Sequence, residues 1–158
     1  MDEALELEVG HKVLEVGAGS GWHAATVAEL VAPSDAPEEE RGHVWTIEIV
    51  PELVLMAQRN IRENGFEDRV TVLHGDGSLG YPPEAPYDRI LVTAAAPSIP
   101  KPLVEQLEDG GILLIPVGGL HFFQSLLKVR KEGGRVHVQD LGGVAFVPLR
   151  GKYGFRTL

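Results

Sequence analysis

Residues 13–21 read Val-Leu-Glu-Val-Gly-Ala-Gly-Ser-Gly, a short apolar run followed directly by alternating glycines. The run Lys12 to Val16 predicts a buried strand, and the apolar spacing from Trp22 to Ala32 predicts a helix after the turn. Glycines between a strand and a helix allow unusual backbone angles and let a ligand approach the main chain. The stretch predicts the first unit of a Rossmann-like α/β fold, and a purely structural turn is the alternative interpretation.

The spacing of these glycines bears on the kind of ligand. It is Gly17-x-Gly19-x-Gly21, followed by the bulky Trp22, whereas dinucleotide-binding turns follow Gly-x-Gly-x-x-Gly. In the dinucleotide pattern a pyrophosphate rests on the helix N-terminus. The observed spacing therefore disfavours a dehydrogenase and favours a ligand that has no pyrophosphate.

Strand-like and helix-like segments alternate after the turn, which is typical of a parallel α/β sheet. Strands are predicted at residues 44–48, 70–74, 87–93 and 111–117, helices at 51–64 and 101–107, and an acidic surface loop at 33–42. The last part predicts an antiparallel hairpin at residues 124–130 and 135–141, then a strand at 144–149. We expect one domain over residues 1–158, with a mostly parallel twisted sheet, helices on both faces and an antiparallel C-terminal hairpin.

Composition excludes several classes of function. The 158 residues carry a net charge of −9 and no cysteine, which excludes disulfides, thiolate metal sites and cysteine nucleophiles. Nucleic acid is not expected as a partner, because phosphate binding needs clustered Lys and Arg. The basic tail of Arg150, Lys152 and Arg156 is interpreted as a solvated terminus. We expect no metal and predict no membrane span or secretory signal, so the expected location is cytoplasmic.

Two carboxylates stand at the ends of predicted strands. Glu48 ends the second strand, where a carboxylate can accept both hydroxyls of a ribose, although it could instead favour the start of the next helix by its charge. Asp76, within Gly75-Asp76-Gly77, follows the third strand and could accept from an adenine amino group, or could belong to a plain Asp-Gly turn. Together with the glycine turn, these strand ends predict one ligand crevice at the carboxyl edge of the sheet.

The chain resembles the protein-L-isoaspartate O-methyltransferase family, which uses S-adenosylmethionine. The resemblance rests on the glycine turn, on Gly75-Asp76-Gly77, and above all on Tyr-Asp-Arg-Ile-Leu-Val-Thr-Ala-Ala-Ala-Pro at residues 87–97. It continues through residues 106–118 and 146–149. It implies methylation of the α-carboxylate of L-isoaspartyl residues in damaged proteins, a repair reaction that releases S-adenosylhomocysteine. Isoaspartyl proteins would then be the partners.

The resemblance also implies roles for individual residues. Thr93, Ala94 and Ala95 would lie beside the reacting methyl group, and no general base is expected, because a carboxylate is ionised at neutral pH. The cofactor-binding residues that it implies are Glu15, Gly17, Ala18, Gly19, Ser20, Gly21, Glu48, Ile49, Gly75, Asp76 and Gly77. The substrate-binding residues that it implies are Pro97, Phe146, Val147, Pro148 and Leu149.

The sequence departs from the family pattern at two places. Family members carry a further segment before the first strand, with a Ser/Thr motif that helps bind the isoaspartyl group, whereas eleven residues precede Lys12 here. Tyr-Gln usually follows the last glycine, but this chain has Trp22-His23, whose roles stay open. Two alternatives therefore remain: a cofactor-binding module or pseudoenzyme with an incomplete substrate site, and a methyltransferase for another small carboxylate.

Overall fold

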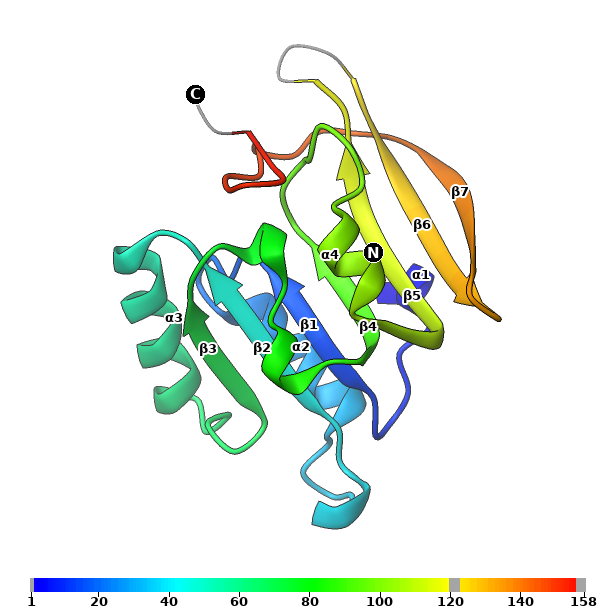
Figure 1. Ribbon diagram of the computed structural model, residues 1–158. Coiled ribbons are helices and arrows are strands. Elements are labelled where there is room, and N and C mark those ends of the chain that lie inside the picture. The colour runs from blue at the N-terminus through cyan, green and yellow to red at the C-terminus, as the bar shows by residue number, and fades with distance from the viewer. Residues whose placement is uncertain (1, 120–122, 156–158) are drawn as a thin grey trace.

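A computed structural model describes residues 2–119 and 123–155, and Figure 1 shows how its elements are arranged. Within these residues, seven strands form one sheet in the order β3-β2-β1-β4-β5-β6-β7. The parallel strands are β1 (Lys12–Val16), β2 (His43–Glu48), β3 (Val70–His74), β4 (Tyr87–Val92) and β5 (Leu107–Val117). An antiparallel hairpin, β6 (Gln124–Glu132) and β7 (Arg135–Val144), extends the sheet beyond β5.

Helices cover both faces of this sheet. They are α1 (Asp2–Leu5), α2 (Trp22–Val31), α3 (Pro51–Glu63) and α4 (Lys101–Glu105), with short 3-10 turns at Glu38–Glu40, Gly77–Leu79 and Pro82–Glu84. Side chains of α2 and α3 pack with Val13 and Val44 on one face, whereas Leu103 of α4 packs with Leu14 on the other. Successive residues of a strand point to opposite faces, so β1 supplies both clusters.

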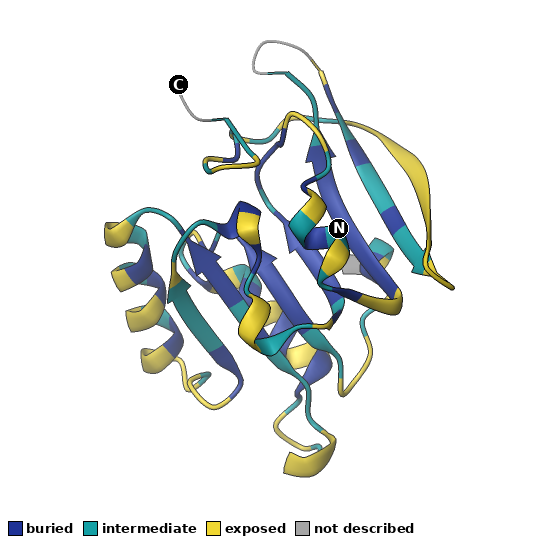
Figure 2. Cartoon of the chain, viewed as in Figure 1, coloured by how far each residue is buried: buried dark blue, intermediate teal, exposed yellow. Residues whose placement is uncertain are grey.

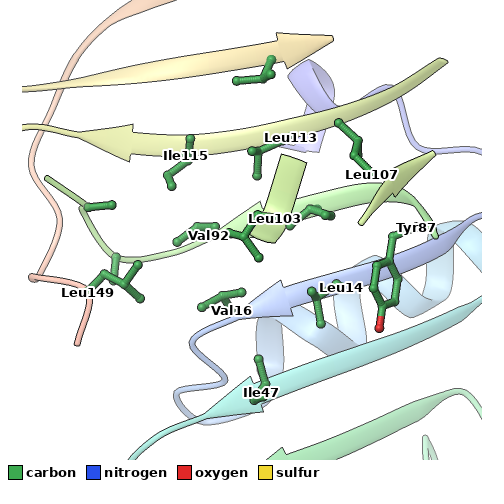
Figure 3. Close-up of a cluster of buried hydrophobic side chains, with 14 residues drawn as sticks. Leu14, Val16, Ile47, Tyr87, Val92, Leu103, Leu107, Leu113, Ile115 and Leu149 are labelled. Atoms are coloured by element: carbon green, nitrogen blue, oxygen red, sulfur yellow. The ribbon is translucent and has the colours of Figure 1, made fainter. Parts of the chain in front are cut away.

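The central strands are buried on both faces, which explains their continuous apolar runs. Figure 2 shows this burial in β1, β4 and β5, and shows that β7 is exposed at the edge of the sheet. Figure 3 shows the cluster on the α4 side, where Leu14, Val92 and Leu113 pack together. Leu149 joins the same cluster from the C-terminal segment, so that segment is held against the core.

The predicted parallel strands and the hairpin are confirmed, with shifts of a few residues at their ends. The hairpin turns at Gly133 and Gly134, whose φ angles of 58° and 77° match the positive values that a tight two-residue turn needs. The fifth strand begins at Leu107 rather than 111, because α4 already ends at Glu105.

The predicted strand at residues 144–149 is wrong. β7 itself extends to Val144, and the chain then leaves the sheet, with isolated bridges at Pro148 and Arg150. Proline has no N–H to donate to a strand ladder, which is one reason that no strand forms there. Arg156 of the basic tail lies outside the described residues.

The short helix α1 was not predicted from the sequence. Its Leu5 is fully buried and packs against Leu91, Ile112 and Leu114 of the sheet. The Arg89 guanidinium donates to the backbone carbonyls of Leu5 and Glu6. These contacts attach the N-terminal residues to β4 and β5, on the same face as α2.

Candidate functional site

The glycine turn after β1 lies against the end of β4. Gly17 has a φ of 100°, and a Cβ there would lie 2.5 Å from Thr93 Oγ1, so a larger residue does not fit. Thr93 Oγ1 donates to the carbonyl oxygens of Val16 and Gly17, at 3.1 and 3.0 Å. Glycine at position 17 therefore lets the ends of β1 and β4 meet at one point.

The Glu48 carboxylate joins this turn to the start of α3. Its Oε1 accepts from the N–H groups of Ala18 and Gly19, at 3.1 and 3.3 Å. Its Oε2 accepts from the N–H groups of Ile49 and Val50, at 3.0 and 3.1 Å. The side chain is 8% exposed, and its negative charge lies at the N-terminal end of α3, as the helix-start interpretation expected.

A cavity of about 380 Å³ opens at the carboxyl ends of β1, β2 and β4. The predicted residues that line it fall into two groups. Those on the sheet side are Gly17, Gly19, Glu48, Ile49, Gly77, Thr93 and Ala94. Those on the C-terminal segment are Val147, Pro148 and Leu149. The structure thus brings the ends of three strands and the C-terminal segment around one cavity, as ligand sites in open α/β sheets require.

Several other predicted residues do not line the cavity: Ala18, Ser20, Gly21, Gly75, Ala95, Pro97, Phe146, Glu15 and Asp76. Glu15 is 1% exposed and points to the α2 side of the sheet. It accepts from Thr46 Oγ1 at 2.6 Å, and His23 Nδ1 lies 2.7 Å from its other oxygen. His23 is thereby placed beneath the turn, while Trp22 is 57% exposed on the surface.

Asp76 is bound to backbone and side-chain donors of the protein itself. Its Oδ1 accepts from the N–H and the hydroxyl of Ser78, at 3.0 and 2.6 Å. Its Oδ2 accepts from the N–H of Lys152 at 2.8 Å. Asp76 therefore holds the C-terminal segment as well as the turn after β3.

The C-terminal segment, residues 146–155, crosses the end of β4, and we call it the strap. Ala95 N–H donates to the Val147 carbonyl at 2.7 Å, and Leu149 N–H donates to the Ala95 carbonyl at 2.8 Å. Figure 1 shows the strap in red beyond the ends of β1 and β4. Its residues 147–150 line the cavity together with the strand ends.

Five lining residues were not predicted as site residues: Val16, Ile47, Val50, Leu53 and Arg150. Arg150 follows the Phe146–Leu149 motif directly, so its position was a usable signal. Leu53 lies in the predicted helix at residues 51–64, where periodicity alone does not separate a core contact from a cavity wall.

Within residues 2–119 and 123–155, no group of three or more His, Cys, Asp or Glu side chains is placed to hold a metal ion. No helix in the described part of the chain is long and apolar enough to cross a membrane.

A parallel sheet with an antiparallel edge, a glycine turn after β1 and an acid at the end of β2 together define the class I methyltransferase fold. The family model described as protein-L-isoaspartate(D-aspartate) O-methyltransferase matches residues 1–154. The chain belongs to this family.

Individual relatives agree with this assignment. Protein-L-isoaspartate O-methyltransferases from Hyperthermus butylicus and Thermococcus sibiricus are each 54% identical over 99% of this chain. The chain spans 65% and 67% of the lengths of those relatives.

Solved structures are similar as well. One protein-L-isoaspartate O-methyltransferase has a TM-score of 0.86 and 29% identity, covering 96% of this chain and 46% of its own. A Plasmodium falciparum beta-aspartate methyltransferase, solved with S-adenosyl-L-homocysteine, has a TM-score of 0.77 and 26% identity. That match covers 94% of this chain and 68% of the Plasmodium chain.

Proposed function

We propose that the chain transfers a methyl group from S-adenosylmethionine to the α-carboxylate of L-isoaspartyl residues in damaged proteins. One observation carries this proposal: a single cavity is lined by residues from several of the family's motifs. The glycine turn, Glu48 and Thr93 line it together with Val147–Leu149. A cytoplasmic location and the absence of a nucleic-acid partner stay predictions, and the oligomeric state stays open.

The residues that line the cavity fit such a cofactor. Its volume of about 380 Å³ lies within the range of small-molecule sites. A carboxylate has room for about four donors, so two ribose hydroxyls would replace part of the backbone set that Glu48 now accepts. The approach of a ligand to Gly17 and Gly19 is open, because these residues carry no side chain. Asp76, to which the resemblance gives the adenine end, lies outside this lining and is bonded to Ser78 and Lys152.

The main requirement that methyl transfer places on the protein is alignment of the methyl donor with the acceptor carboxylate. When bound, S-adenosylmethionine supplies an electrophilic methyl group on a sulfonium. The acceptor carboxylate is ionised at neutral pH and needs no general base. Holding the two reactants in line can supply about 7 kcal/mol or more of the barrier. This agrees with the contacts of Thr93, whose hydroxyl donates to the glycine turn and so fixes the turn against β4. Thr93 is therefore not proposed as a general base.

The test is transfer of labelled methyl from S-adenosylmethionine to an isoaspartyl peptide, with the matching aspartyl peptide as control. We expect base-labile label on the isoaspartyl peptide alone. A chain that binds S-adenosylhomocysteine but labels neither peptide would contradict the proposal and support a cofactor-binding module. Label on other small carboxylates, with none on the isoaspartyl peptide, would mean that the chain transfers methyl groups to a different substrate.

A further inference from the structure

The strap is attached at both of its ends by side chains of other elements. Near its C-terminal end, Asp76 and Ser78 accept from the N–H groups of Lys152 and Tyr153, at 2.8 and 3.0 Å. In its middle, the backbone of Ala95 bonds to residues 147 and 149. Its beginning, at Phe146, is attached by one side chain, that of Gln124.

The Gln124 amide bonds both main-chain groups of Phe146. Its Nε2 donates to the Phe146 carbonyl at 2.9 Å, and its Oε1 accepts from the Phe146 N–H at 2.6 Å. The residue is 8% exposed, so water competes weakly for these bonds. Each polar atom of the amide therefore has a partner on the same strap residue.

The position of Gln124 at the end of β6 explains why a side chain, and not the backbone, bonds Phe146. The ladder between β6 and β7 ends with the pair Gln124 and Val144. Phe146 lies just beyond that pair, where the chain turns from the sheet edge toward the strand ends. The Gln124 amide thus replaces the backbone bonds that the ladder no longer makes. It fixes the direction in which the strap leaves the sheet.

We propose that Gln124 is a positioning residue for the methyl acceptor, an inference that rests on the proposed function. By fixing Phe146, it sets the place of Val147–Leu149, which line the cavity together with Thr93 and Ala94. Gln124 itself does not line the cavity. Its loss should disturb acceptor alignment more than cofactor binding, because Glu48 and the Asp76–Ser78 attachment remain.

The experiment compares Gln124→Met, which removes both bonds at similar volume, with Gln124→Glu, which keeps the acceptor and loses the donor. Gln58→Met is the matched control, since the Gln58 amide also bonds a backbone carbonyl, that of Val72, away from the cavity. The measurements are KM and kcat for an isoaspartyl peptide, S-adenosylhomocysteine affinity by calorimetry, and trypsin cleavage after Arg150 and Lys152 followed by mass spectrometry.

We expect Gln124→Met to raise the peptide KM about tenfold and to speed cleavage of the strap about as much, from the loss of two net hydrogen bonds. For Gln124→Glu, the peptide KM and the cleavage rate should lie between those of Gln124→Met and the wild type. Gln58→Met should match the wild type in both. S-adenosylhomocysteine affinity should change less than about threefold. The inference fails if the wild-type KM and cleavage rate persist in Gln124→Met, or if cofactor affinity falls as far as peptide affinity.

These arms separate the inference from the proposed function. A wild-type chain that methylates no isoaspartyl peptide would remove the proposed function. Faster cleavage of the Gln124→Met strap, with cofactor affinity unchanged, would then still support Gln124 as the residue that positions the strap. Equal cleavage of the two chains would overturn it.

Discussion

Glu48 is the residue at which the two interpretations of the site meet. Its carboxylate accepts from the N–H groups of Ala18, Gly19, Ile49 and Val50, and it also lines the cavity. The same group therefore holds the turn in shape and lies at the cavity. Under the proposed function it would also bind the ribose, whose hydroxyls would take over part of the existing bonding.

The first prediction concerns this carboxylate. Glu48→Ala should lower S-adenosylhomocysteine affinity by about 10- to 100-fold, since a charged acceptor is lost and buried N–H groups lose their partner. The affinity of Glu48→Gln should fall less, because one acceptor oxygen remains. Calorimetric titration measures both, and unchanged affinity in Glu48→Ala would show that the ribose assignment is wrong.

A second prediction concerns the glycine turn. Gly17→Ala should destabilise the protein by roughly 2–4 kcal/mol, because its Cβ meets Thr93 Oγ1 and its φ is positive. Gly19→Ala is the matched control: its Cβ has open space, so only the backbone cost of about 1–2 kcal/mol applies. Urea denaturation of both variants checks this, and equal losses would contradict the close approach at Gly17.

The helix α1 shows that an element of four residues can contribute to the stability of the fold. Leu5 is fully buried against Leu91, Ile112 and Leu114. We predict that Leu5→Ala costs about 2–5 kcal/mol, as for other buried leucines. Leu55→Ala on α3, where the side chain is 68% exposed, should change little. Thermal unfolding of the two variants compares them, and a small effect at Leu5 would mean that α1 is not anchored as described.

Local pattern was enough for some elements and not for others. The strands β1 to β4 were predictable because each is a short, largely apolar run bounded by turn residues. The helix α1 was missed because four residues show no periodicity, and its contacts lie far away in the sequence. The predicted strand at 144–149 failed because Pro148 has no N–H for a ladder, and the segment is instead held at isolated points by Ala95 and the Gln124 side chain.

The same distinction applies to the site. Gly17 and Glu48 were predicted because a strand end followed by glycine or by an acid is a local signal. The link between Asp76 and Lys152 spans 76 residues, and no local signal shows it. Gln124 was likewise unremarkable in the sequence, since its partner is defined only when β6 and the strap meet.

For the whole molecule, pH is expected to change the stability through the half-buried side chain of His43. Burial is the main cause that lowers the pKa of His43 below its ordinary value of 6.5, and nearby Glu84 and Asp68 oppose this shift. The unfolded chain therefore binds a proton at His43 more readily than the folded chain does. Stability is complete above about pH 6.5 and falls as the pH drops toward the folded pKa.

We predict that His43→Gln flattens the fall of the melting temperature between pH 7 and about 5.5. His137→Gln, on the exposed strand β7, is the control and should follow the wild-type curve. Calorimetric scans at several pH values measure the slopes. Parallel slopes for wild type and His43→Gln would show that His43 does not carry this dependence.

Under the proposed function, the cavity lined by the strand ends and the strap holds S-adenosylmethionine. The most direct test is a crystal structure of the chain with S-adenosylhomocysteine. We predict density between the Gly17–Gly19 turn and residues 147–150, with the ribose hydroxyls at hydrogen-bonding distance from the Glu48 carboxylate. Density elsewhere on the molecule, or a ribose that makes no contact with Glu48, would contradict the account.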